Sequence, residues 1–140
     1  MFQKSSQILK QVYPILIGSF ELAMSDRVAI YARVSADQQS VADQIHELRE
    51  VGDQLGWRIT NIFIDEGMAG AKGRDKRPAH GQLLKAIARN EIDLVATWTI
   101  NHLAHSLYDL IKFLDKIREQ DIHLYLHQQN MDTSSATYVI

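Results

Sequence analysis

The sequence has no cysteine and only two prolines among its 140 residues. The lack of cysteine excludes disulfides, thiolate zinc sites and cysteine nucleophiles, and it fits a reducing compartment, so we expect a cytoplasmic protein. No apolar run reaches the roughly 20 residues that a membrane-spanning helix needs. Strong positive charge is also missing, because the formal net charge is −2 at pH 7. Any contact with a polyanion must therefore come from a local basic patch.

The length and the 46% hydrophobic content indicate a single globular domain with a substantial core. Regular patterning starts only at Arg27. We therefore expect residues 1–26 to be an N-terminal extension outside the fold, with the functional chain starting at Met24. The domain itself is expected to span residues 27–140.

From Arg27 onward, short apolar runs alternate with segments of helical periodicity. Strands are predicted at 28–34, 57–64, 92–98 and 122–126, a possible edge strand at 131–135, and helices at 41–55, 83–90 and 106–117. Such β-α-β repeats favour an α/β fold, a three-layer α/β/α sandwich whose mostly parallel sheet has about four or five strands. The edge strand is expected to be antiparallel. In the last helix the predicted buried stripe is Leu107, Leu110, Ile111, Leu114 and Ile117.

The end of the first predicted strand carries the most informative pair of residues, Arg33 and Ser35. Strand side chains alternate between faces, so both are expected on the same side of the sheet, at the carboxyl edge where α/β proteins bind ligands. A hydroxyl nucleophile beside a fixed cation suits attack on a phosphate-like centre. Ser35 and Gln38 also fit a helix capping box, although Ser40 and Asp43 offer a second one. Both interpretations of Ser35 stay open.

Four stretches of this chain resemble the catalytic domain of the serine recombinases, the resolvase/invertase family. They are Tyr31-Ala-Arg-Val-Ser35 with Asp37, Gln39 and Gln44; Asp65-Glu-Gly-Met-Ala-Gly70; Arg77-Pro78 followed by Leu83-Leu84; and Trp98 through Ser106. The order and spacing of the four also fit. The resemblance covers the chain from Arg27 to its end.

The resemblance implies that Ser35 attacks a phosphodiester of double-stranded DNA and forms a 5′-phosphoserine link with release of a 3′-hydroxyl. It further implies strand exchange within a dimer or tetramer of subunits. The family uses no metal or other cofactor, since arginines hold and neutralise the scissile phosphate.

By position, Arg33 and Arg77 would be two of these phosphate-holding arginines, a role that suits the guanidinium's fixed fork of donors. Gln39 and Gln44 would be polar supports, and Asp65 an acidic member of the site. Each also has a plain structural interpretation: Arg77 as a solvated loop residue, the glutamines as surface residues, and Asp65 as a turn residue.

The chain departs from the family pattern after the third predicted strand. The family has Asp-Arg-Leu-x-Arg-Ser, whereas this chain has Asn101, His102 and His105 at the aspartate and the two arginines. Ala69 also replaces a family serine. An unperturbed histidine, with a pKa of about 6.5, is mostly neutral at pH 7, so two fixed cations are lost. A bound phosphate can restore part of that charge by raising the histidine pKa. A metal site at the two histidines is not expected without further ligands.

The family continues into a long dimer-forming helix and a DNA-binding domain, and both are expected to be missing from this sequence. We therefore expect site-specific DNA recombination chemistry that is impaired or absent. One alternative is a non-enzymatic, recombinase-like module that binds or regulates an intact recombinase. Another is an unrelated small α/β phosphate-binding domain.

Overall fold

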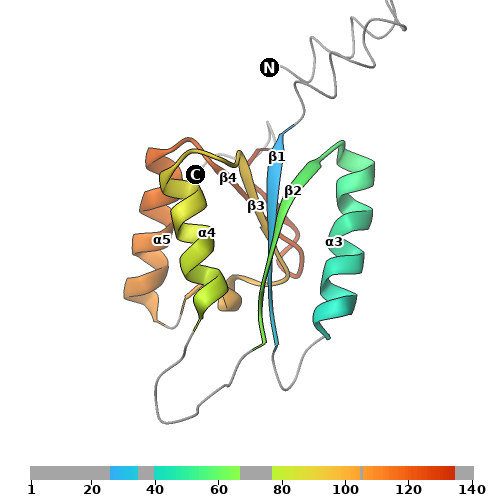
Figure 1. Cartoon of the computed structure of the whole chain (residues 1–140), viewed down its shortest axis with the longest axis horizontal. Coiled ribbons are helices and arrows are strands. Elements are labelled where there is room, and N and C mark those ends of the chain that lie inside the picture. The colour runs from blue at the N-terminus through green and yellow to red at the C-terminus, as the bar shows by residue number, and fades with distance from the viewer. Residues whose placement is uncertain (1–25, 35–39, 67–76, 105, 135–140) are drawn as a thin grey trace, which may run out of the picture.

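A single mixed sheet forms the centre of the fold in the computed structural model, which describes residues 26–34, 40–66, 77–104 and 106–134. Its strands are β1 (Arg27–Arg33), β2 (Arg58–Asp65), β3 (Leu94–Thr97), β4 (His123–Leu126) and β5 (Met131–Asp132). The spatial order is β2-β1-β3-β4-β5 (Figure 1). Strands β1 to β4 are parallel, and β5 pairs antiparallel with β4. The predicted α/β fold with an antiparallel edge strand is confirmed.

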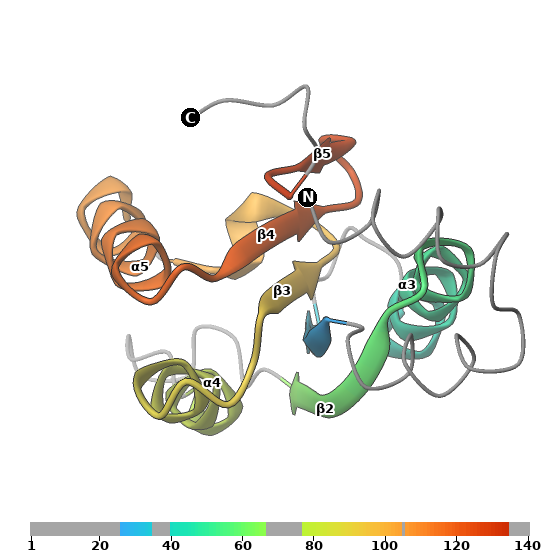
Figure 2. The ribbon, with the colours of Figure 1, turned by 90° about the horizontal axis from the view of Figure 1, so that it is seen from above.

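Helices cover both faces of this sheet, as the right-handed β-α-β connections require. Helix α3 (Val41–Leu55) lies on one face, and α4 (Pro78–Ala88) and α5 (Leu107–Glu119) lie on the other (Figures 1 and 2). A short 3₁₀ turn, η2 (Ile100–His102), follows β3. None of the helices in the described part of the chain has both the length and the apolar content that crossing a membrane requires.

The helix ends follow their local sequence signals. The Ser40 hydroxyl accepts a hydrogen bond from the backbone N–H of Asp43 at 3.1 Å and caps α3. Gly56 ends that helix with a positive φ of 77°, which glycine adopts without strain. Because Ser40 is the N-cap of α3, the interpretation of Ser35 as the cap of this helix is wrong. Ser35 itself lies outside the described residues.

Strand β1 is buried on both faces, as expected of an interior strand among parallel neighbours. Val28 and Ile30 belong to the core under α3, which also contains Leu48. Ala29 and Tyr31 belong to the core under α4 and α5. By strand alternation, Arg33 continues the Ala29–Tyr31 face and so lies on the α4 side at the end of the strand.

The apolar stripe predicted for α5 is only partly the buried one. Phe113 and Ile117 are the buried residues of this helix, whereas Leu107 is 72% and Ile111 49% exposed. The prediction was wrong for Leu107 and Ile111, because the apolar arc of α5 is wider than the face that contacts the sheet. Phe113, which was not in the predicted stripe, supplies the large buried side chain.

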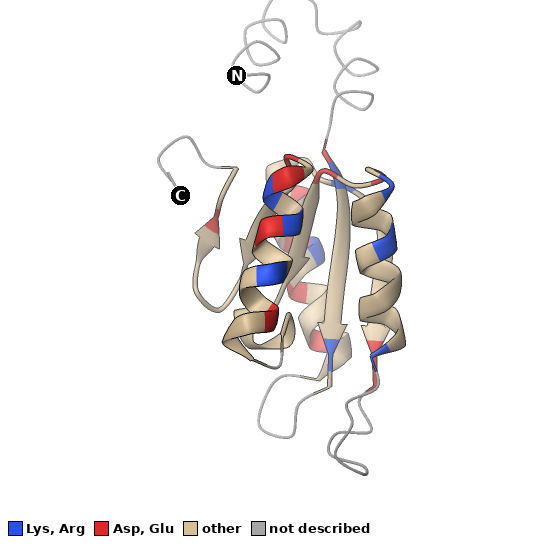
Figure 3. Ribbon diagram, turned by 90° about the vertical axis from the view of Figure 1, so that its left-hand side faces the viewer, with Lys and Arg blue, Asp and Glu red and all other residues tan. Residues whose placement is uncertain are grey.

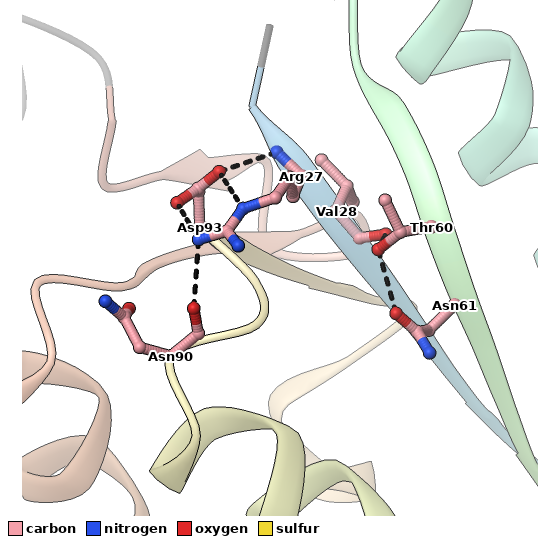
Figure 4. A network of polar contacts seen from close by, with 6 residues as sticks. All are labelled: Arg27, Val28, Thr60, Asn61, Asn90 and Asp93. Carbon is pink, nitrogen blue, oxygen red and sulfur yellow. Dashed lines mark hydrogen bonds and ion pairs between the residues drawn. The ribbon is translucent and has the colours of Figure 1, made fainter.

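The amino ends of β1 and β3 are fastened together by Arg27 and Asp93 (Figure 4). The Asp93 carboxylate accepts hydrogen bonds from the backbone N–H of Arg27 at 2.8 Å and from its Nε at 3.1 Å, and Arg27 Nη2 also donates to the carbonyl of Asn90. These contacts lower the pKa of Asp93, with the Arg27 hydrogen bond as the largest cause. This network lies at the amino ends of the strands, whereas Arg33 lies at the carboxyl end of β1.

Two helical glycines should respond in opposite ways to alanine. A Cβ at Gly52 in α3 would lie 2.9 Å from Cε3 of Trp57, whereas a Cβ at Gly81 in α4 meets nothing within 4 Å. Gly52→Ala should therefore lower the free energy of unfolding by about 1–3 kcal/mol through overpacking. Gly81→Ala should raise it by about 0.5–1 kcal/mol. Urea unfolding followed by circular dichroism measures both, and a stabilised Gly52→Ala variant would contradict the packing described for α3.

Candidate active site

Strands β1 and β2 end side by side at the carboxyl edge of the sheet. Arg33 is the last residue of β1 and is paired in register with Asp65, the last residue of β2. The backbone N–H of Val34 extends this pairing by donating to the carbonyl of Asp65 at 3.1 Å. Basic and acidic residues both occur at this end of the strands (Figure 3). The β-ladder therefore fixes a cation and a carboxylate at neighbouring positions.

The Asp65 carboxylate is buried and accepts three hydrogen bonds. The donors are the hydroxyl of Tyr31 at 2.7 Å and the backbone N–H groups of Ala79 at 2.9 Å and His80 at 3.0 Å. Those N–H groups belong to the first turn of α4, where they have no partner within the helix. The N-cap residue of α4, Arg77, makes no capping hydrogen bond with its side chain. Asp65 therefore caps α4 from the neighbouring strand and is not an ordinary turn residue.

The positive charges of both candidate phosphate-binding arginines affect the pKa of the Tyr31 hydroxyl. Its pKa is raised, first by burial and then by its hydrogen bond to Asp65, while the positive charges of Arg77 and Arg33 act in the opposite direction. Arg33 pairs with Asp65 in the β-ladder, and Arg77 directly precedes the helix turn whose N–H groups donate to Asp65. Asp65 thus joins the two segments that bear these arginines, which are far apart in the sequence.

The start of α4 also holds the 3₁₀ turn that follows β3. Arg77 Nη1 donates to the carbonyl of His102 at 3.2 Å, and His80 Nε2 donates to the carbonyl of Leu103 at 2.8 Å. The His80 ring packs edge-on against Tyr31. Two side chains of one helix turn thus fix η2 beside the ends of β1 and β2.

Gln44 is a fully buried residue of α3, so its interpretation as a surface residue is wrong. Its side-chain amide Nε2 donates to the backbone carbonyl of Arg33 at 3.0 Å. This contact ties α3 to the last residue of β1. It supports the backbone that positions the Arg33 guanidinium on the opposite face.

His102 is buried, with 4% exposure, and neither ring nitrogen has a hydrogen-bond partner among the described residues. Burial, together with the positive charge of Arg33, lowers the pKa of His102 to about 4. In the unliganded protein the imidazole is therefore neutral at pH 7. It does not replace the fixed cation that an arginine would supply at this position.

Three predicted site residues, Ser35, Gln39 and His105, lie outside the described residues. Asn101 is exposed on η2. In the described ranges no group of three or more histidine, aspartate or glutamate side chains could hold a metal ion.

Sequence reasoning missed two contributors to the site. Tyr31 was taken only as part of the sequence motif, although a buried phenol hydroxyl normally needs a polar partner, and that need was the available signal. His80 gave no signal, because its partner at residue 103 is distant in the sequence.

Comparisons with known proteins agree with this architecture. Residues 28–139 match the family described as the resolvase N-terminal domain. The DNA-invertase of Escherichia phage P1 is 28% identical over 105 residues, which cover 75% of this chain and 50% of that protein. Protein uvp1 of Escherichia coli is 29% identical over 107 residues, with 75% of this chain and 50% of that protein covered. The chain thus spans about half the length of the curated relatives it matches.

Two solved structures extend the comparison to the fold. The N-terminal catalytic domain of TP901-1 integrase is 30% identical and superposes with a TM-score of 0.67, covering 79% of this chain and 84% of that domain. A resolvase family site-specific recombinase from Streptococcus pneumoniae has the same fold, with a TM-score of 0.68 at 18% identity and coverage of 79% and 78%. The chain belongs to the resolvase family of serine recombinases, and the family's N-terminal domain occupies residues 28–139.

Proposed function

We propose that this chain is the catalytic part of a site-specific DNA recombinase in which Ser35 is the nucleophile. The observation that carries the proposal is that Asp65 joins the end of β1, which bears Arg33, to the start of α4, which bears Arg77. Ser35 follows Arg33 by two residues in the sequence. DNA is the proposed substrate because the matched relatives include DNA-invertases and the N-terminal catalytic domain of an integrase.

In the proposed step the Ser35 oxygen forms a bond to phosphorus, the bond to the 3′-oxygen breaks, and the proton lost by serine ends on the released 3′-hydroxyl. Arg33 and Arg77 neutralise the charge that develops on the phosphate oxygens. Gln44 and Asp65 act indirectly: Gln44 holds the Arg33 carbonyl, and Asp65 anchors the helix turn that bears Arg77. Gln39 is proposed as a further polar support, and dimers or tetramers as the working assembly.

A trapping experiment tests this proposal. The chain is incubated with nicked duplexes of random sequence, from which a short fragment diffuses away after cleavage, and covalent species are separated on a denaturing gel. We expect a protein–DNA adduct that peptide mapping assigns to Ser35. Nucleophile removal should abolish a covalent step, so Ser35→Ala should reduce the adduct by several orders of magnitude.

Ser40→Asn is the matched control, because it removes a nearby hydroxyl yet keeps a side-chain oxygen that can cap α3. It should form the adduct at the wild-type level. An adduct that persists in Ser35→Ala, or that maps to another residue, would contradict the assigned nucleophile.

A non-enzymatic, recombinase-like binding module is the second candidate, and the state of His102 favours it. The family places an arginine at this position, whereas the neutral, buried His102 supplies no fixed charge. If the module interpretation is correct, neither the wild-type chain nor a variant with His102→Arg and His105→Arg will form an adduct. An adduct that appears only in the restored variant would indicate an impaired recombinase.

A further inference from the structure

The unpartnered imidazole of His102 requires an explanation. Buried polar side chains in folded proteins are nearly always hydrogen-bonded, and those without a partner are often found at functional sites. The His102 side chain is buried, and neither ring nitrogen has a hydrogen-bond partner among the described residues. Arg77 donates to the backbone carbonyl of His102, and the positive charge of Arg33 acts on the His102 ring. Both ring nitrogens therefore have unused hydrogen-bonding capacity at the candidate phosphate site.

Burial is the main reason why the ring is neutral, and the positive charge of Arg33 in β1 acts in the same direction. Arg77, at the start of α4, directs its Nη1 at the backbone carbonyl of His102. The carboxylate at this edge is Asp65 of β2, and its oxygens accept from the first turn of α4 and from Tyr31. His80 of α4 directs its Nε2 at the carbonyl of Leu103. Among the described residues, no carboxylate accepts a hydrogen bond from the ring of His102.

We propose that His102 is a proton-coupled anion contact: when the tetrahedral oxyanion of a phosphodiester binds beside Arg33, His102 takes up a proton and donates to an anion oxygen. The inference rests on the proposed function, because it assigns the anion to the same site. A negative charge close to an imidazole favours the charged form, and a hydrogen bond from imidazolium to an oxyanion is charge-assisted. The anion thus supplies the negative charge that the described residues around the ring do not.

A site of this kind differs from one built with arginine at the same position. Arginine is charged at every working pH, so its affinity for an anion changes little between pH 8 and pH 5.5. Protonation of His102 on binding instead links affinity to pH, and the anion binds more tightly as the pH falls. The replacement of arginine by histidine is then a change in the regulation of the site as well as a loss of charge.

Sulfate is a suitable probe because it is tetrahedral and does not titrate between pH 5.5 and pH 8. The full chain, with isotope-labelled histidine, is titrated with sulfate at a series of pH values at constant ionic strength, and the ring resonances of His102 are followed by NMR. We expect saturating sulfate to move the His102 titration midpoint upward. If the bound imidazole titrates near the ordinary histidine value, sulfate should bind about tenfold more tightly at pH 5.5 than at pH 8.

Two glutamine variants separate His102 from the general charge of the protein. His102→Gln should bind sulfate with an affinity that is nearly independent of pH. His46→Gln removes an exposed histidine of α3, 73% exposed and paired with Glu50, and should keep the wild-type dependence. If His102→Gln fails to fold, the ring resonances of the wild-type chain still decide the question.

An unchanged His102 midpoint at saturating sulfate would overturn the proposal, as would a full pH dependence in folded His102→Gln. Absence of any sulfate effect on the His102 ring at every pH would also overturn it. The proposed function is tested independently of this inference. A Ser35 adduct can form while His102 stays neutral, and His102 can take up a proton on sulfate binding in a chain that forms no adduct.

Discussion

Replacing Asp65 by alanine should lower the free energy of unfolding by about 3 kcal/mol or more. The substitution leaves three buried or partly buried donors without their acceptor: the Tyr31 hydroxyl and the backbone N–H groups of Ala79 and His80. Each buried donor that loses its partner costs about 1–3 kcal/mol, and the first turn of α4 also loses a negative charge at its positive end. Urea unfolding monitored by circular dichroism measures the loss.

Two comparison variants separate the parts of this effect. Tyr31→Phe removes only the phenol hydroxyl and should cost about 1–2 kcal/mol. Asp53→Asn changes an exposed carboxylate on α3 and should stay within about 0.5 kcal/mol of wild type. If Asp65→Ala lowers the free energy of unfolding no more than Tyr31→Phe does, the capping of α4 by Asp65 does not contribute to stability.

This stability effect has a functional consequence. Asp65 anchors the helix turn next to Arg77, and Arg77 in turn holds the carbonyl of His102. A weakened Asp65 contact should therefore loosen the proposed phosphate site even though the carboxylate contacts no phosphate. Asp65 is thus a positioning residue in the proposed reaction.

The unliganded protein should lose about 2 kcal/mol of stability between pH 8 and pH 5 because of His102. Its pKa is lowered to about 4 in the folded state, chiefly by burial, whereas an unfolded histidine titrates near 6.5. Between these values the unfolded chain binds a proton that the folded chain does not, so stability rises with pH. The contribution is fully present above about pH 6.5 and declines as the pH falls towards 4.

The difference between wild type and His102→Gln isolates this contribution from all other titrating groups. Free energies of unfolding at pH 8 and pH 5 should change by about 2 kcal/mol less in His102→Gln than in wild type. His46→Gln should follow wild type, because its side chain is 73% exposed. Equal pH dependence in wild type and His102→Gln would mean that His102 is accessible to protons in the folded state.

Both ends of α3 and the start of α5 were predictable because their causes are local, whereas the start of α4 at Pro78 was predicted five residues too late. Ser40 and Ser106 cap the helices that follow them, and Gly56 ends α3, each through contacts within a few residues. The alternation of apolar runs and helical periods similarly led to the parallel sheet with its antiparallel edge strand. The resemblance of residues 31–106 to the resolvase family rests on the same short motifs.

Long-range burial could not be predicted from those motifs. Which part of the apolar arc of α5 contacts the sheet depends on helix rotation, so Leu107 and Ile111 were wrongly placed in the core. The capping acceptor of α4 is the Asp65 carboxylate, 14 residues before Ala79, and His80 donates to the backbone carbonyl of Leu103.

The chain's local chemistry alone establishes the order of its elements, where α3 and α5 start, and the residue types at the carboxyl edge. Packing determines the environment of those residues: Asp65 becomes a cap, Gln44 a buried support and His102 a neutral imidazole. The physical reason is that hydrogen-bond partners and desolvation come from segments far apart in the sequence, which meet only when β1, β2, α4 and η2 converge.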